Sequence, residues 1–333
     1  MSTLNQLFRK ELELCGVGAG QTVAVLSEGM NLRDYAEASL AAASALGAKV
    51  VDVNLPSDTR TDPNERLTSI GRNALSQNKW AMDACLAADL VVDHMLLLFS
   101  HEQVAMQNAG ARVLLVVEPQ PILERLFPDK GLRAKVEAAE RRLKAAKTLR
   151  FTNEAGTDVT YQLKNDFILS EYGYTDTAGR WDHWPGGFLA TIGAKGGVEG
   201  RVVMDRGDII FPWKAAVSEP IEFIIRKGSV QEINGGAQAK QLSAFIDSYN
   251  DPRAKVTSHI GWGLNEACKW DPELPGIGMD GRAHYGNVLF SLGPDTEFGG
   301  DNDTACHLDL PMRNCSLWLD GEMIVEHGNV LAT

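Results

Sequence analysis

The sequence predicts an α/β fold class: an N-terminal α/β domain with a parallel sheet, followed by a mainly antiparallel β (α+β) domain. Three observations predict this. The chain has 333 residues, about twice the roughly 150 residues of one ordinary domain. Its first part alternates short apolar runs with helical patterns, whereas its second part consists largely of β-type runs between glycine-containing turns. We therefore expect one domain over residues 1–150 and a second, metal-binding domain over residues 151–333.

The first part contains valine- and leucine-rich runs that are typical of strands buried on both faces. An alanine- and leucine-rich helical pattern over Leu32–Leu46 ends at Gly47, a common residue just after a helix. A last helix is expected after Gly131, because its apolar residues fall on one helical stripe. Alternating strands and helices indicate a parallel sheet with right-handed crossovers. The expected strands are Thr22–Ser27, Val50–Leu55, Leu90–Met95 and Val113–Val117.

The second part has the signals of antiparallel strands joined by short turns. The dipeptide Asp320-Gly321 separates two apolar runs and fits a type I′ hairpin turn. One helix is expected at Ala237–Tyr249. Further strands are expected at Phe151–Asn153, Val159–Leu163, Ile221–Arg226 and Val230–Ile233.

Composition restricts the partners and the compartment. Lys and Arg number 32 and Asp and Glu 44, so the formal net charge of −12 disfavours nucleic acid and anionic membranes as partners. The five cysteines are odd in number and have no CxxC spacing, which is typical of a reducing compartment. No secretory signal is visible, and the most apolar run is too short to span a bilayer. We therefore expect a cytoplasmic protein.

Several common catalytic motifs are missing from the sequence. The glycine-rich segment Gly16–Gly20 precedes its strand, whereas a dinucleotide-binding loop must follow one, so we interpret it as a turn. The patterns GxxxxGK[ST], HExxH and GxSxG do not occur. The chemistry is therefore expected from the seven histidines and their acidic neighbours.

The sharpest local feature is the pair His307 and Asp309. On a strand, residues i and i+2 point to the same face, so the imidazole and the carboxylate would project side by side. A second histidine, His259 or His284, would complete a two-histidine, one-carboxylate set, which suits non-haem Fe(II) with O₂. Such a site would be net positive and would favour an anionic, chelating substrate. The alternative is a histidine that is simply hydrogen-bonded to the aspartate.

Three further residues are candidates for acid–base chemistry. His94 ends the third expected strand, and ligands bind at the carboxyl ends of parallel strands. An apolar environment would keep His94 neutral and able to act as a base, but it would equally suit a structural histidine bonded to the backbone. Glu171 and His183 lie in aromatic-rich segments that suit a flat ring substrate, or ordinary packing of aromatic side chains.

Several segments between residues 150 and 310 resemble the thermophilic-type (family M29) metallo-aminopeptidases. They are NEAGTDVTYQL, GRWDHWPGGF, HIGWGLN and CHLDLP. Those enzymes build a two-metal site with two glutamates, and the matching positions here are Phe188 and His259. Because phenylalanine cannot bind a metal, the resemblance implies the same scaffold with a site for one softer ion.

Within this resemblance the chain is similar to the 2,5-dihydroxypyridine 5,6-dioxygenase family of bacterial nicotinic acid and nicotine catabolism. The resemblance implies Fe(II) held by His259, His307 and Asp309, with His94, Glu171 and His183 around a small aromatic substrate. It implies that 2,5-dihydroxypyridine is opened by O₂ between C5 and C6 to N-formylmaleamic acid, without an organic cofactor. The aminopeptidase relatives further imply a homo-oligomer. The rival hypotheses are an M29-type aminopeptidase and a non-catalytic protein that binds an aromatic ligand.

Overall fold

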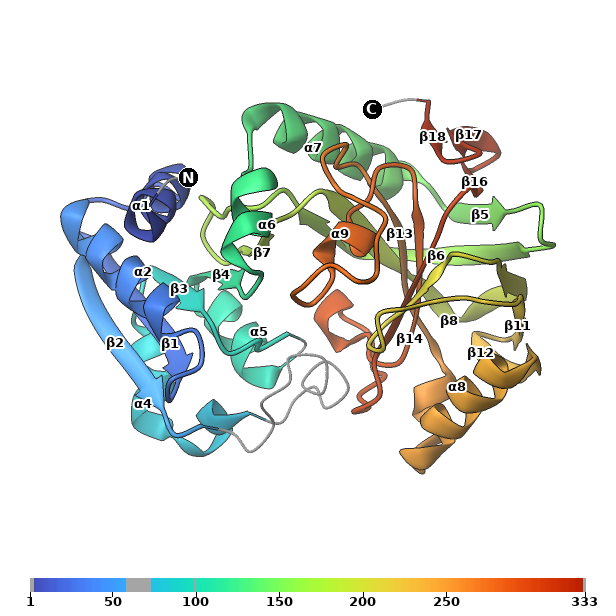
Figure 1. Ribbon diagram of the computed structural model, residues 1–333, viewed down its shortest axis with the longest axis horizontal. Coiled ribbons are helices and arrows are strands. Elements are labelled where there is room, and N and C mark those ends of the chain that lie inside the picture. Colours follow the sequence, from blue (N-terminus) through green and yellow to red (C-terminus); the bar gives the residue numbers. More distant parts are fainter. Residues whose placement is uncertain (1–2, 58–72, 99, 332–333) are drawn as a thin grey trace. The chain divides into compact units, whose positions relative to one another are not determined.

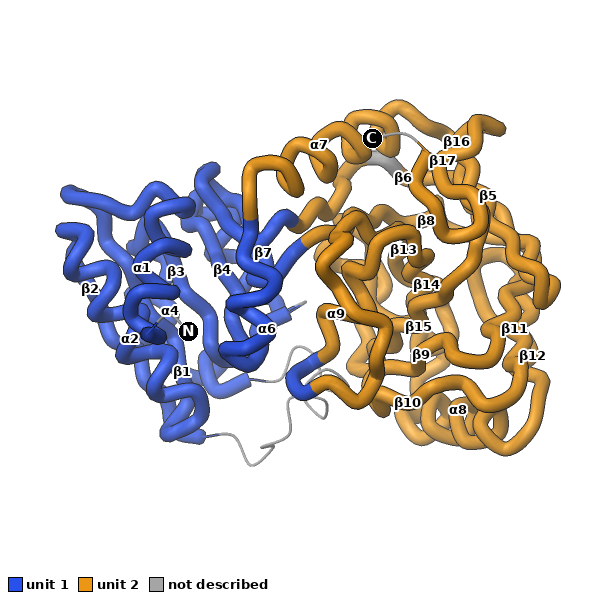
Figure 2. The backbone as a smooth tube through the Cα atoms, turned by 45° about the horizontal axis from the view of Figure 1, so that its top comes forward, with its two compact units in different colours: residues 1–128, 172–186, 275–277 blue, residues 129–171, 187–274, 278–333 orange. Residues whose placement is uncertain are grey.

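The computed structural model describes residues 3–57, 73–98 and 100–331. The chain forms two compact units, shown in blue and orange in Figure 2. Unit 1 comprises Met1–Pro128, Tyr172–Gly186 and Pro275–Ile277, and unit 2 comprises Asp129–Glu171, Gly187–Leu274 and Gly278–Thr333. The chain thus leaves unit 1 at Pro128 and returns to it twice. A domain boundary at residue 150 stays a prediction.

Unit 1 is built on a five-stranded parallel sheet of order β2-β1-β3-β4-β7 (Figure 1). The four strands expected from the sequence are confirmed, because each lies within two residues of its predicted bounds. The fifth strand, β7, comes from the later segment that we had assigned to the β domain. The strands are β1 (Thr22–Glu28), β2 (Lys49–Leu55), β3 (Leu90–Asp93), β4 (Arg112–Val116) and β7 (Trp181–Trp184).

The helices of unit 1 include one that the sequence patterns had not predicted. This helix, α1, begins with a capping box in which Thr3 and Gln6 exchange hydrogen bonds, and it buries Phe8 and Leu12. The predicted helix α2 is confirmed. No helix in the described ranges is long and apolar enough to cross a membrane. The elements are α1 (Leu4–Leu14), α2 (Arg33–Ala45), η1 (Ala74–Gln77), α4 (Lys79–Leu86), α5 (His101–Asn108) and α6 (Gln120–Arg125).

Unit 2 is built on an eleven-stranded antiparallel sheet (Figure 1). Its central path has the order β15-β14-β13-β8-β6-β5-β16-β17-β18, and β11 pairs with both β8 and β12. The strands are β5 (Thr148–Thr152), β6 (Asp158–Glu171), β8 (Phe188–Met204), β11 (Ile221–Arg226), β12 (Ser229–Gly235), β13 (Thr257–Gly263), β14 (Val288–Leu292), β15 (Leu308–Met312), β16 (Ser316–Leu319), β17 (Glu322–Glu326) and β18 (Asn329–Val330).

Three α-helices and several short elements complete the described part of unit 2. The helices predicted after Gly131 and at Ala237–Tyr249 are confirmed as α7 and α8. Asp129 caps the first of them by accepting the backbone N–H of Leu132 at 2.8 Å. These elements are α7 (Lys130–Ala145), α8 (Ala237–Ser248), α9 (Met279–Arg282), β9 (Ile209–Ile210), β10 (Ala215–Ala216), η2 (Pro252–Lys255) and η3 (Thr296–Phe298).

The hairpin between β16 and β17 confirms the turn prediction. Asp320 and Gly321 have φ angles of 47° and 87°, and a type I′ turn requires positive φ at both central residues. The Asp320 carboxylate accepts the backbone N–H groups of Lys147 and Thr148 at 3.0 and 2.8 Å. The turn therefore also holds the start of β5 in place.

Candidate metal centre

Three neighbouring strands of unit 2 present polar side chains in one row. Strands β13, β14 and β15 are consecutive in the sheet, and Ser291 of β14 pairs in register with Asp309 of β15. The pairing of β13 with β14 shifts between Thr257 and Ile260, at the position of His259. A local irregularity of this kind re-aims a side chain. His307 precedes β15 and lies two residues before Asp309, as expected for side chains on one face.

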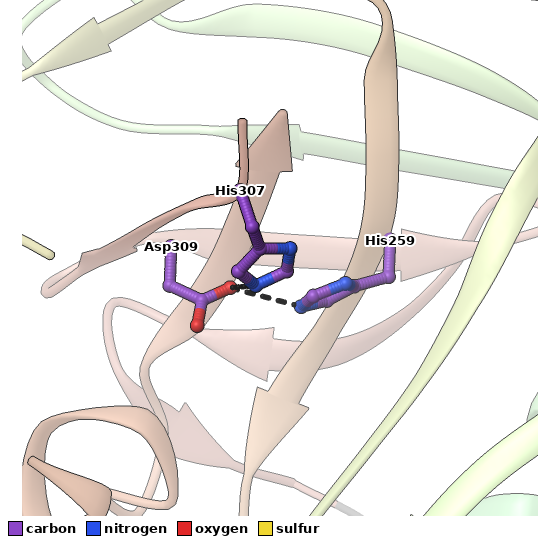
Figure 3. Close-up of side chains that lie close together, drawn as sticks. All are labelled: His259, His307 and Asp309. Carbon is purple, nitrogen blue, oxygen red and sulfur yellow. Dashed lines mark hydrogen bonds and ion pairs between the residues drawn. The ribbon is translucent and has the colours of Figure 1, made fainter. Parts of the chain in front are cut away.

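The side chains of His259, His307 and Asp309 converge on one another (Figure 3). The Nε2 atoms of His259 and His307 lie 3.2 and 3.1 Å from the same oxygen, Asp309 Oδ1. The three residues are only 4%, 2% and 3% exposed. One ligand atom from each lies within 4.8 Å of the others, and no other His, Cys, Asp and Glu residues in the described part of the chain form such a group.

The charge state of this cluster follows from its surroundings. Burial alone would raise the pKa of Asp309, but electrostatic interactions with His307 and Arg282 and hydrogen bonds from both histidines hold it well below its usual range. Burial lowers the pKa of His259, and hydrogen bonding and charge from Asp309 oppose this effect only in part. A buried carboxylate thus stays ionised beside a neutral imidazole, and these are the protonation states that bind a metal.

Two further side chains contact the Asp309 carboxylate, and the sequence patterns had missed both. Ser291 Oγ donates to Asp309 Oδ1 at 2.9 Å and lies 2.7 Å from His259 Nε2. Arg282 Nε donates to the other oxygen, Oδ2, at 2.6 Å. Arg282 stands two residues before His284, in a segment whose histidine is its only metal-ligand signal. Nothing in that segment signals a buried arginine, so only the fold could find it.

Of the two histidines left open as the second ligand, only His259 joins the cluster. His284 donates from Nδ1 to the backbone oxygen of Tyr285 at 3.0 Å, and its ring lies edge-on to Trp270 with centroids 5.2 Å apart. It is half-buried, and it is outside the group of potential ligands. His284 therefore lies outside the cluster and packs against Trp270.

His94 lies in unit 1, where both of its ring nitrogens meet partners. Nδ1 donates to the backbone oxygen of Val116 at 2.8 Å, and Nε2 lies 3.1 Å from Ser39 Oγ. The rings of Phe8 and Tyr35 lie edge-on to it, with centroids 5.9 and 6.0 Å away. Burial lowers the pKa of His94 to about 4. These contacts favour the structural interpretation of His94 over that of a catalytic base.

His183 is buried in β7 of unit 1, in register with Leu115 of β4. Its backbone N–H donates at 2.9 Å to Asp182, whose carboxylate also accepts the N–H of Gly173 at 2.9 Å. Asp182 thus ties the strand that carries His183 to the preceding turn.

Glu171 is buried at the end of β6 in unit 2 and pairs with Phe188, which pairs in turn with Gly263 of β13. Gly263 is four residues from His259, about 13 Å at the usual rise of a strand. Glu171 therefore lies on the same sheet as the His-His-Asp cluster but outside it.

Fold and site together define a class of protein. A parallel α/β unit is combined with a large antiparallel unit that gathers two histidines and one aspartate, a donor set typical of mononuclear non-haem metal oxygenases. The chain belongs to the family described as 2,5-dihydroxypyridine 5,6-dioxygenase, whose model matches residues 3–332. This family contains dioxygenases, which are oxidoreductases. The match agrees with the dioxygenase prediction and not with the aminopeptidase or binding-protein alternatives.

Individual relatives agree with this assignment. The 2,5-dihydroxypyridine 5,6-dioxygenase of Pseudomonas putida KT2440 is 42% identical over 336 residues, which cover 99% of this chain and 96% of the relative. A solved structure of the 2,5-dihydroxypyridine dioxygenase from that organism superposes with a TM-score of 0.95 at 42% identity, covering 99% of this chain and 97% of the other.

A second solved structure resembles this chain in its fold alone. Wild-type AmpT from Thermus thermophilus superposes with a TM-score of 0.63 at 14% identity, and the match covers 99% of this chain and 100% of the other. The predicted fold class is therefore confirmed over nearly the whole chain.

Proposed function

We propose that this chain binds one Fe(II) ion through His259 Nε2, His307 Nε2 and Asp309 Oδ1. The observation that carries the proposal is the meeting of these three buried atoms, with both imidazoles within 3.2 Å of one carboxylate oxygen. Two imidazoles and one carboxylate are the donor set that suits non-haem Fe(II). The residues therefore fit a single Fe(II) ion.

The proposed reaction opens 2,5-dihydroxypyridine between C5 and C6 and gives N-formylmaleamic acid, as a step in nicotinate or nicotine degradation. Both atoms of O₂ enter the product, so atoms and electrons balance without a further oxidant. When bound, the iron supplies the one-electron chemistry by which O₂ reacts with an aromatic ring. The support for this substrate is the family match over residues 3–332.

The chain's own residues would bind the ring and move its protons. The positive charge of Arg282 beside Asp309 favours an anionic substrate, so a bound hydroxypyridine would lose a hydroxyl proton within the site. We propose His183 as the group that accepts this proton and Glu171 as the group that orients the ring. His94, also predicted as a base, is better suited to a structural role because its ring nitrogens already meet Val116 and Ser39.

The test is oxygen consumption by anaerobically iron-loaded protein that is given 2,5-dihydroxypyridine, with the product mass measured under ¹⁸O₂. We expect one iron per chain, one O₂ consumed per substrate and two labelled oxygens in the product. His307→Ala should lose both iron and activity and keep its circular dichroism spectrum. His284→Ala is the matched control, because it removes a histidine of the same unit outside the cluster, and it should retain iron.

Two outcomes would contradict the proposal. One is an iron-replete and active His307→Ala protein. The other is two metal ions per chain with release of N-terminal residues from peptides, which would restore the aminopeptidase alternative.

We also propose a cytoplasmic location and a homo-oligomeric assembly. All five cysteines lie in the described part of the chain as buried thiols, which suits the reducing cytoplasm. The homo-oligomer stays a prediction, which light scattering of the purified protein would test.

A further inference from the structure

The two carboxylate oxygens of Asp309 face different partners. Oδ1 lies 3.1 to 3.2 Å from both imidazole Nε2 atoms and accepts the hydroxyl of Ser291 at 2.9 Å. Oδ2 accepts Nε of Arg282 at 2.6 Å. One oxygen is thus directed at the proposed metal position, and the other is engaged by a buried cation.

Arg282 is itself held by the protein. Its guanidinium lies over the ring of Phe211, 4.0 Å from the centroid, and the backbone N–H of Phe211 donates to the backbone oxygen of Asp309 at 3.0 Å. Gly278, directly before α9, has a φ of 95°, and a Cβ there would collide with the Phe211 ring. The backbone of Asp309 and the cation at its side chain are therefore both supported by Phe211.

The position of Arg282 is also fixed through its backbone. Its carbonyl oxygen accepts the Asn287 side-chain amide at 2.9 Å, and the same amide donates to the oxygen of Gly281 at 2.7 Å. The Arg282 side chain is only 7% exposed. The guanidinium is held by the Phe211 ring and the Asp309 carboxylate, on a backbone that Asn287 fixes, so it has little freedom to release Oδ2. Charge-assisted hydrogen bonds of this kind are the strong ones.

We propose that Arg282 is a positioning residue that restricts Asp309 to a single metal-binding oxygen. This inference rests on the proposed function, since it concerns the ligand set assigned there. A carboxylate with both oxygens free can chelate the ion and occupy a position that a chelating ring or O₂ needs. By holding Oδ2, Arg282 keeps that position available and fixes the direction of Oδ1, the role that outer hydrogen bonds play at metal sites.

The test compares Arg282→Gln, Arg282→Lys and the wild type by titration with Co(II), whose absorption spectrum responds to the number and arrangement of its ligands. Arg282→Gln should lower the metal affinity about 10- to 100-fold, the usual effect of losing an outer hydrogen-bond partner, and should change the Co(II) spectrum. Arg282→Lys keeps the charge without the planar donor group and should be intermediate. In the iron enzyme, the KM for 2,5-dihydroxypyridine should rise by a larger factor than kcat falls.

Arg313→Gln is the matched control, because it makes the same substitution at an exposed arginine of the same unit that contacts Trp270. It should leave the metal affinity and the spectrum unchanged. Wild-type affinity and spectrum in Arg282→Gln would overturn the inference and leave the proposed function intact. If Arg282→Gln does not fold, wild-type values in Arg282→Lys would overturn it equally. A wild-type protein that binds neither Fe(II) nor Co(II) would instead overturn the proposed function.

Discussion

His94 in unit 1 and His259 in unit 2 are both buried, and burial lowers the pKa of both. They differ in what their ring nitrogens meet. Around His94 these are the backbone oxygen of Val116 and the hydroxyl of Ser39, so the imidazole completes a hydrogen-bond network. Around His259 the partners include the hydroxyl of Ser291 and also a carboxylate that is shared with a second histidine. Burial is therefore common to both histidines, and only His259 adds an ionised neighbour and a second potential ligand.

The largest effect on metal affinity is expected from Asp309→Asn. This substitution keeps the size of the side chain and removes the negative charge beside Nε2 of His259, where His94 instead meets the hydroxyl of Ser39. Metal affinity should fall by more than about 100-fold, because the loss of a ligand exceeds that of an outer partner. Competition with a chelator of known affinity measures it. Wild-type metal affinity in the Asp309→Asn protein would show that the aspartate is only a hydrogen-bond acceptor.

The next effect is expected from His94→Leu. The backbone oxygen of Val116 would lose the donor that His94 provides, at a cost of about 1–3 kcal/mol for a group left unsatisfied. Ser39 Oγ would keep its hydrogen bond to the backbone oxygen of Tyr35. Urea denaturation should show this loss, while iron affinity and kcat stay near wild type. A fall of about 10²–10⁴ in kcat at unchanged stability would instead identify His94 as a general base.

A pH dependence should accompany His94. Its pKa in the folded protein is about 4, against an ordinary value of 6.5. At pH values between these two, the histidine is therefore protonated in the unfolded chain and neutral in the folded protein. The free energy of unfolding should therefore fall by about 3 kcal/mol as the pH drops through this window. Urea denaturation of the metal-free protein at pH 7 and pH 4.5 measures it. The fall should be smaller in His94→Leu, and an equal fall in both proteins would assign it to other groups.

The smallest effects are expected from a pair of hydroxyl deletions, Ser291→Ala and Ser39→Ala. Each removes a hydroxyl that lies beside Nε2 of one of the two histidines. Each should cost about 0.5–1.5 kcal/mol of stability, but only Ser291→Ala should weaken metal binding, by less than about tenfold. Equal metal affinities in the two variants would show that Ser291 does not support the cluster.

Much of the fold could be predicted from the sequence, because local residue patterns determine it. The buried strands of unit 1 are continuous apolar runs, and the hairpin at Asp320 needs only its own dipeptide to specify the turn. The pairing of His307 with Asp309 was equally local, since alternation along a strand places both on one face. These features could be predicted because neighbouring residues alone determine them.

The remaining features depend on contacts between distant segments. Trp181–Trp184 resembles any aromatic strand, and its place beside β4 follows from tertiary structure alone. Arg282 and Asp309 are 27 residues apart in the sequence, and no local pattern of residues predicts their contact. The choice of His259 over His284 likewise depends on the irregular pairing of β13 with β14.

Strand β7 belongs to the sheet of unit 1 although it comes late in the sequence, and this has a consequence for shortened forms of the chain. A polypeptide that stopped at residue 150 would lack this strand, and the backbone donors and acceptors along β4 would be left open to intermolecular pairing. Truncation at that point would thus expose a sheet edge that can pair with the edge of another chain.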